Sequence, residues 1–450
     1  MDRLGKFFSL VHNEYVKVFK KTSTKIMLVL VLLGAFAFSG FIYLINSESG
    51  SYNEMNTDAF KNEIEDRISE LKETKPKGYK TNIEISNYIL DNDISYGSWE
   101  AIALSSILDD ESITDSDKEK ILQFVKDKDD KGYCKFMSEN ATDEAEKWAY
   151  KYRADNNIGL TDEYNNQNRL IDSIFSHKIA MSTMSENSDS YQEEKDAETV
   201  ELYQLENKVY INTADYTSVL GMSNSDMDDD SDSSSFWKGF MNTPSLVSFI
   251  GVLMIVIAGG SVAAEFSQGT IKFLLINPVK RWKILMSKYF TCISIGYIMI
   301  ILTYIISIPA IGIINGFGDM SAPYLFVKSG EVHQMSSFLY VARQYLVNSI
   351  EVVVIATMAF AISSLVRSSA LAIGISVFAM FAGNTITAIL SQLNQDWARY
   401  LIFSNVDLLG ISQGDSLFPQ QTLGFAICVI VAHMAVFILT AWDGFTKKSV

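Results

Sequence analysis

Residues 246–289 read LVSFIGVLMIVIAGGSVAAEFSQGTIKFLLINPVKRWKILMSKY, an apolar run that passes directly into a basic loop. The apolar part, 246–264, holds no charged residue, and as a helix it is long enough to cross a hydrocarbon core of about 30 Å. The same pattern recurs along the chain. The six predicted spans are 26–45, 246–264, 289–314, 345–366, 370–393 and 423–442. We therefore expect an all-α integral membrane protein with six transmembrane helices.

Charge divides the chain into parts with different surroundings. The 450 residues have a formal net charge of −16, yet residues 47–243 alone carry −23, so the remainder carries +7. We expect three parts: 1–46 with the first span, an inserted polar domain at 47–243, and 244–450 with five spans. Because the large polar domain is strongly acidic, it would repel phosphates, and a nucleic-acid partner is not expected.

The distribution of Lys and Arg over the short loops predicts the orientation in the membrane, because such loops are retained on the cytoplasmic side when they are basic. With the N-terminus inside, the cytoplasmic segments hold 14 Lys and Arg, and the outer loops 315–343 and 394–422 hold three. We expect a multi-pass protein of a bacterial cell membrane, with both termini cytoplasmic and 47–243 extracellular.

The N-terminal residues 3–21, RLGKFFSLVHNEYVKVFKK, have the pattern of a basic amphipathic helix. The apolar residues at helical spacing are Leu4, Phe7, Phe8, Val11, Tyr15, Val18 and Phe19. Such a helix, leading into a span, is expected to lie as an elbow in the interface and to bind anionic lipid. The alternative is a juxtamembrane anchor with no other role. The first span is preceded by 25 residues and is predicted to be retained rather than cleaved as a signal peptide.

The inserted domain is predicted to be mostly helical with a minor β element. Segments 60–72, 117–128, 141–154 and 163–184 have helical composition and period, whereas 198–212 alternates like a hairpin. Residues 223–235, SNSDMDDDSDSSS, predict a flexible acidic tether to the second span.

No catalytic residue, metal site or cofactor is expected in this chain. The acidic tether matches alternate positions of a calcium loop, but Ser231 stands where the sharp turn needs Gly and Trp237 where the bidentate Glu belongs. The sequence holds no HExxH and no CxxC, and Cys134 is the single cysteine of the inserted domain.

The loop at 265–288 combines positive charge with an apolar stretch at 271–276. A loop that only fixes topology needs the charge but not the apolar face. At about 25 cal/mol per Å², docking that face on a bilayer or a partner would gain several kcal/mol.

The pattern of this loop resembles the cytoplasmic loop of type-2 ABC exporter permeases, and among them the bacitracin- and lantibiotic-resistance permeases most. The residues that carry the resemblance are Glu265, Gly269, Thr270, Leu274, Pro278, Arg281, Trp282 and Lys288. The resemblance extends over 1–46 and 244–450, and the inserted domain departs from the minimal family pattern.

The resemblance implies that 267–276 is a coupling helix seated in a groove of a separate ABC ATPase subunit. In that role Gly269 and Thr270 shape the entry to the helix, and Phe273 and Leu274 are its buried knobs. Glu265 anchors the end of the second span. The residues expected to face lipid phosphate or the ATPase are Lys280, Arg281 and Lys288.

The chain contains no G-x4-GK-[ST] sequence, so ATP and Mg are expected in the partner ATPase. Six spans imply half of a pore, completed by a second copy or a homologous permease. Within the spans, Glu351 and His433 are ionisable and costly to expose to lipid, so they should face protein or water. With Asn384 they are candidates for a translocation pathway, and the alternative for each is a hydrogen-bonded packing role.

The expected function is therefore the permease subunit of an ABC exporter that moves a peptide or an amphipathic, lipid-like compound outward. One alternative is a membrane sensor or scaffold whose outer domain binds a ligand without transport. Another is an ion-coupled secondary transporter, for which one buried Glu is thin support. The sequence leaves the substrate and the composition of the pore open.

Overall fold

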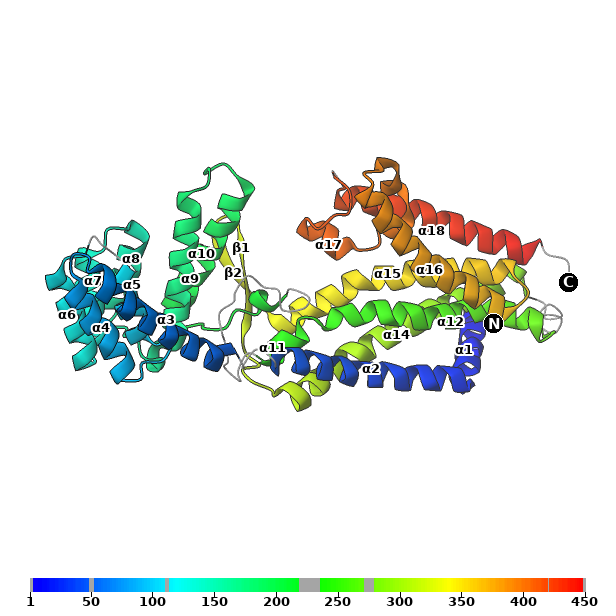
Figure 1. Ribbon diagram of the computed structural model, residues 1–450. Coiled ribbons are helices and arrows are strands. Elements are labelled where there is room, and N and C mark those ends of the chain that lie inside the picture. The colour runs from blue at the N-terminus through cyan, green and yellow to red at the C-terminus, as the bar shows by residue number, and fades with distance from the viewer. Residues whose placement is uncertain are drawn as a thin grey trace.

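The computed structural model describes residues 3–47, 52–109, 113–217, 235–270, 279–419 and 421–447. The molecule is elongated, with a helical bundle at one end and a separate helical domain at the other (Figure 1). Both chain termini lie at the end of the bundle that points away from the helical domain, here called the terminal end. The opposite end of the bundle, which faces the helical domain, is called the domain end.

Six helices among the described residues are long and apolar enough to cross a membrane, as predicted. They are α2 (Thr22–Ser47), α12 (Leu246–Ser267), α14 (Arg281–Asn315), α15 (Ser337–Leu365), α16 (Ser369–Gln392) and α18 (Leu423–Thr446). Helices α14 and α15 begin eight residues before the predicted spans, because hydropathy marks the hydrocarbon-crossing part and a helix continues beyond it.

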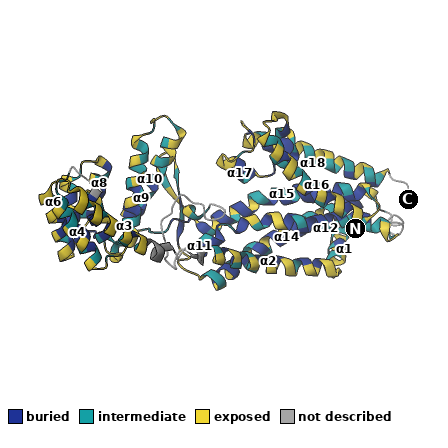
Figure 2. Ribbon diagram, in the orientation of Figure 1, coloured by how far each residue is buried: buried dark blue, intermediate teal, exposed yellow. Residues whose placement is uncertain are grey.

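Helices α12 and α15 form the centre of the bundle. In each, 61% of the most apolar 18-residue window is buried, against 22% in α2 and 17% in α16 and α18. Figure 2 shows the exposed faces of the outer helices. An apolar helix with one exposed face is suited to contact lipid on that side, so the burial pattern agrees with a membrane-embedded bundle.

The predicted N-terminal amphipathic helix is present as α1 (Arg3–Lys20). It lies across the terminal end of the bundle and packs against α14 (Figure 1). The rings of Phe7 and Phe290 meet edge-on with centroids 6.0 Å apart, and the hydroxyl of Tyr15 donates to Ser294. Its apolar stripe therefore has a protein partner in α14, while Phe8 remains 64% exposed.

The inserted domain is helical in two packed groups. The first group surrounds Ile85 and Leu104, and the second surrounds Ile171 and Ile174. Its helices are α3 (Tyr52–Thr74), α4 (Tyr79–Asp91), α5 (Trp99–Asp109), α6 (Asp115–Asp127), α7 (Asp130–Asn140), α8 (Glu144–Asp155), α9 (Asn165–Ser182) and α10 (Asp189–Asn207). The segment predicted as a helix from 141 begins later, because Asp143 caps α8 by accepting from the backbone N–H of Ala145 and Glu146.

The predicted hairpin at 198–212 is wrong, because 198–207 belongs to α10. The β element is instead a hairpin of β1 (Pro323–Lys328) and β2 (Glu331–Ser336) in the connection between α14 and α15. The strands pair antiparallel, with Lys328 opposite Glu331. Ser329 and Gly330 both have positive φ, as a two-residue hairpin turn that matches the strand twist requires. The acidic tether at 223–235 lies outside the described residues except for Ser235.

Buried hydrogen bonds join the segment after α10 to this hairpin and to the start of α15. The side-chain oxygen of Asn212 accepts from the backbone N–H of Leu325 at 3.0 Å. Thr213, which is fully buried, places its hydroxyl 2.8 Å from that of Ser337 and 3.1 Å from the carbonyl oxygen of Pro323. These five residues are called the joint below. The joint fixes the inserted domain to the first residue of α15.

Candidate functional site

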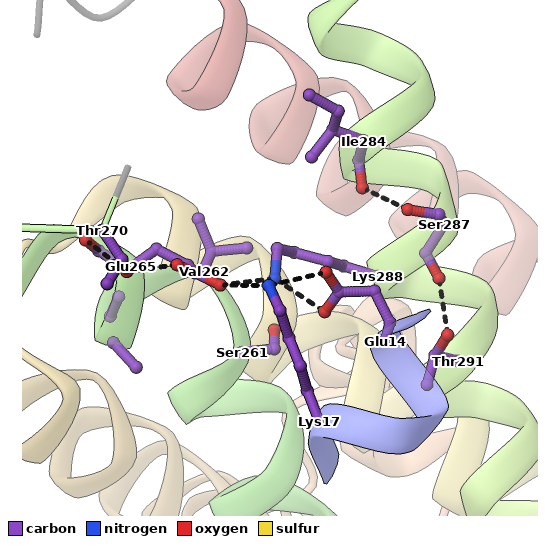
Figure 3. Close-up of polar contacts among 12 residues, drawn as sticks. Glu14, Lys17, Ser261, Val262, Glu265, Thr270, Ile284, Ser287, Lys288 and Thr291 are labelled. Carbon is purple, nitrogen blue, oxygen red and sulfur yellow. Dashed lines mark hydrogen bonds and ion pairs between the residues drawn. The ribbon is translucent and has the colours of Figure 1, made fainter. Parts of the chain in front are cut away.

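Charged side chains from three helices meet at the terminal end of the bundle. The ammonium of Lys288 on α14 donates to Glu14 on α1 at 2.8 Å and to Glu265 on α12 at 3.0 Å. Lys17 on α1 contacts the same two carboxylates at 3.4 and 3.5 Å (Figure 3). The hydroxyl of Thr270 donates to the second oxygen of Glu265. These five residues are called the ionic cluster.

Burial makes the ionic cluster sensitive to the loss of any one charge. The side chain of Lys288 is 2% exposed, and those of Glu14 and Glu265 are 11% and 13% exposed. A charge removed from water is tolerated only when opposite charges and hydrogen bonds replace its hydration. Two carboxylates and two ammonium groups balance, and Lys17, at 51% exposed, connects the cluster to the surface.

The positions of the three buried charges follow from the local sequence. Glu265 lies in the last turn of α12, and Lys288 lies two turns inside α14, so the ends of the 265–288 connection are held together. Glu14 lies on the apolar stripe of α1, seven residues after Phe7 and four before Val18. When α1 packs, a carboxylate on that stripe becomes buried and needs a cation to compensate its lost hydration. Lys288 is that cation.

Helix α12 ends where the predicted coupling loop begins. Gln268, Gly269 and Thr270 form a turn, and Gly269 has φ of 70°, a left-handed conformation typical of the residue that follows a helix. The proposed coupling helix at 267–276 therefore does not begin at Ser267, where α12 still continues. Its remaining positions 271–276, together with the predicted contacts Phe273 and Leu274 and the predicted stop Pro278, lie outside the described residues.

One predicted position in this region has different surroundings from those expected. Lys288 was expected to face lipid phosphate or the ATPase, and this is wrong, because its ammonium is buried between Glu14 and Glu265. Arg281 is exposed, and its guanidinium donates to the carbonyl oxygen of Thr446 at the end of α18 at 3.3 Å. The residues that sequence reasoning missed are Glu14 and Lys17.

The three candidates for a translocation pathway lie on different helices. Glu351 on α15 accepts from the hydroxyl of Ser248 on α12 at 2.8 Å. The Nδ1 of His433 on α18 lies 2.9 Å from the carbonyl oxygen of Val429, one turn earlier in the same helix. Asn384 is exposed on α16. No hydrogen bond in the described chain joins any two of these three candidates, so they do not form one preassembled site.

A second polar cluster links α9 to α10 in the inserted domain. The Nδ1 of His177 lies 2.5 Å from Glu194, and its Nε2 lies 3.5 Å from Glu201, which also accepts from Ser173. The hydrogen bond to Glu201, opposed by desolvation and supported by Glu194, raises the pKa of His177 to about 9. This arrangement stabilises a protonated imidazole between two helices. Across the described residues, no group of three or more His, Cys, Asp or Glu side chains is placed to hold a metal ion.

Comparison with known proteins finds a family match over the C-terminal part of the chain and two similar relatives. A family model described as "Protein of unknown function (DUF2705)" matches residues 205–450, from the last turn of α10 to the C-terminus. Two relatives from Bacillus subtilis (strain 168) are similar to this chain. The Uncharacterized protein YhcI is 35% identical over 216 residues, 48% of this chain and 69% of the relative. The Uncharacterized membrane protein YdbK is 32% identical over 211 residues, 46% of this chain and 80% of the relative. No solved structure matches.

Proposed function

This chain belongs to the DUF2705 family and is a multi-pass membrane protein, and we propose that it is the permease subunit of an ABC exporter. The observation that carries the proposal is the ionic cluster. Glu265 and Lys288 close the two ends of the 265–288 connection, and Glu14 adds the N-terminal helix to the same contact.

The ionic cluster allows the 265–288 connection to pass a movement on to the helices at its two ends. Because the ammonium of Lys288 and the carboxylate of Glu265 pair at 3.0 Å and so tie its two ends together, a displacement of the connection is passed to α12 and α14 together. Through Glu14, α1 moves with them. In the proposed cycle, ATP and Mg bind to a separate ATPase subunit, whose closure pushes the connection and opens the spans outward. Such rigid-body movements about a packed interface are a common form of conformational change.

The proposed cargo is a peptide or an amphipathic, lipid-like compound. The inserted domain carries most of the negative charge of the chain and would attract a cationic amphipathic molecule. Within the bundle, Glu351 and Ser248 place a polar pair between α12 and α15, the two central helices. Asn384 is polar and exposed on α16, where lipid is an unfavourable neighbour, and this supports a second permease copy or homologue against that face.

The direct test is a substitution on the apolar face of the connection. We expect Leu274→Asp to abolish the stimulation of vanadate-sensitive ATPase activity in the reconstituted complex, because a carboxylate would not enter an apolar groove. The matched control is Leu417→Asp, at an exposed leucine in the connection between α17 (Leu408–Gln413) and α18. Unchanged coupling in Leu274→Asp, or the absence of any ATPase that purifies with the chain, would refute the proposal.

The joint supports a second candidate, a sensor or scaffold that transmits ligand binding without transport. Asn212 and Thr213 connect the inserted domain to Ser337 at the start of α15. Glu351→Ala separates the two functions. An exporter should lose transport in this variant, because Glu351 lies in the bundle away from the inserted domain. A sensor should keep both ligand binding by the inserted domain and its signal.

A further inference from the structure

A shallow apolar hollow lies between α14, α15 and α18, near the terminal end of the bundle. It is lined by Leu285, Met286, Tyr289, Phe360, Ile438 and Ala441, with the Tyr289 and Thr357 hydroxyls 3.0 Å apart at its base. The paired hydroxyls satisfy each other, so the remaining surface of the hollow is hydrocarbon. A hydrocarbon-lined hollow in a membrane bundle favours an acyl chain over water.

Trp442 is one of the residues that line the hollow, and Trp282 stacks on it. Trp282, in the first turn of α14, and Trp442, near the end of α18, stack with ring centroids 6.3 Å apart and planes inclined by 7°. They are 38% and 44% exposed, so this aromatic edge of the hollow, here called its rim, is open to the surroundings of the bundle. Tryptophan is enriched where the hydrocarbon of a bilayer meets its headgroups, and this pair therefore places the rim at headgroup level.

Positive charge lies beside the tryptophan pair. Lys280 and Arg281 are exposed, and the ammonium of Lys283 lies 5.8 Å from the ring centre of Trp282. The adjacent carboxylate, Asp443, is engaged by Lys447 at 2.5 Å. The apolar hollow suits an acyl chain, the tryptophan rim suits the boundary between acyl chains and headgroups, and the three nearby cations suit a phosphate. Together they match a phospholipid with an anionic headgroup.

We propose that one anionic phospholipid binds at this place, with an acyl chain in the hollow and its phosphate beside Lys280 and Lys283. The lipid would bridge α18 and α14, whose first two turns belong to the 265–288 connection. The site requires the membrane location of the chain and does not depend on transport, so it can fail or hold independently of the exporter proposal.

The test uses the full chain in phosphatidylcholine vesicles and the fluorescence contributed by the tryptophan pair. That contribution is the fluorescence of the parent chain minus the fluorescence of the Trp282→Phe/Trp442→Phe variant. Bromine on acyl chains quenches nearby tryptophan, so phosphatidylglycerol or phosphatidylcholine with brominated chains is added at equal mole fraction. We expect this tryptophan pair to bind phosphatidylglycerol in preference to phosphatidylcholine, seen as stronger quenching, by a factor of roughly five or more for each lysine.

The variant Lys280→Gln/Lys283→Gln should lose this preference, while Lys20→Gln/Lys21→Gln, at the end of the N-terminal helix and just after it, should keep it. Equal quenching by the two lipids in the parent, or an unchanged preference in Lys280→Gln/Lys283→Gln, would overturn the proposal. Inorganic phosphate is added to the same vesicles as a separate arm. If it removes the preference, the site is one for free anions that needs no acyl chain, and the lipid assignment is wrong.

Discussion

Glu14 and Lys288 are 274 residues apart in the sequence, and their charged groups lie 2.8 Å apart in a buried ion pair. The pair fixes the N-terminal helix α1 on α14, and the contacts of Phe7 and Tyr15 continue along the same face. Helix α1 is therefore more than a juxtamembrane anchor. It is part of the packed terminal end of the bundle.

Removal of the central cation should destabilise the bundle. Lys288→Met leaves Glu14 and Glu265 buried with only the exposed Lys17 beside them, and loss of one partner of a buried pair costs about 3–5 kcal/mol. We expect a clear decrease in the thermal unfolding temperature of the chain in detergent.

Two further variants of the ionic cluster separate the effect of an unpaired buried charge from the effect of altered packing. Glu14→Gln/Glu265→Gln/Lys288→Met removes all three buried charges and should recover much of the lost stability, because no unpaired charge remains. Lys17→Met should cost at most about 1 kcal/mol, since Lys17 is half exposed. An unfolding temperature of Lys288→Met equal to that of the parent would contradict a structural ion pair.

The joint predicts a local effect on hydrogen exchange in the hairpin. In Asn212→Ala the backbone N–H of Leu325 loses its acceptor, and a lost hydrogen bond of about 1 kcal/mol corresponds to roughly fivefold faster exchange. Mass spectrometry of the peptide that contains β1 measures this rate. Asn92→Ala is the control, because Asn92 bonds only to Tyr88 within its own helix end among the contacts described. Unchanged exchange in β1 would show that the inserted domain is not held through Asn212.

The His177 cluster predicts a pH dependence of stability in the inserted domain. The pKa of His177 is about 9 in the folded chain, above the value of about 6.5 expected when it is unfolded. The stabilisation of the folded domain by the protonated His177 is therefore complete below about pH 6.5 and is lost as the pH rises through about 9. We expect the unfolding temperature to fall over that interval, by about 2–4 °C for each kcal/mol that the protonated imidazole contributes. His177→Gln should remove this decrease, and His12→Gln, an exposed control on α1, should keep it. A decrease that persists in His177→Gln would have another origin.

The architecture was predictable where one physical signal dominates. Length and hydropathy identified all six spans, and helical spacing identified α1. The hairpin was misplaced because 198–212 alternates, yet it is rich in Glu, Gln and Leu, which favour a helix, and α10 continues to Asn207. The signal for the true hairpin was present in the sequence, since Ser329-Gly330 is a turn dipeptide between two short β-forming runs.

The site was predictable only in part, because its members come from distant segments. The loop pattern indicated Glu265 and Lys288 but not that they would pair, since the distance between them depends on how α12 packs against α14. Glu14 was recognisable as an acidic residue on an apolar stripe, but its partner depends on how α1 packs. The resemblance implied that Lys288 faces lipid phosphate or the ATPase, and a buried position requires partners on other helices that the local sequence does not show. Here two carboxylates compensate the cost of burial.

The orientation of the chain is the last prediction, and it rests on 14 Lys and Arg at the terminal end and its connections against three in the outer loops. Cysteines placed at Tyr96, which is 55% exposed in the inserted domain, and at Lys447, whose side chain is 78% exposed after α18, report the two sides. The exposed native Cys428 is replaced by Ala in both variants. A membrane-impermeant maleimide should label Tyr96→Cys in intact cells, and it should label Lys447→Cys only after the membrane is permeabilised. Labelling of Lys447→Cys in intact cells would place the 265–288 connection outside the cell, where no ATP-driven partner can reach it.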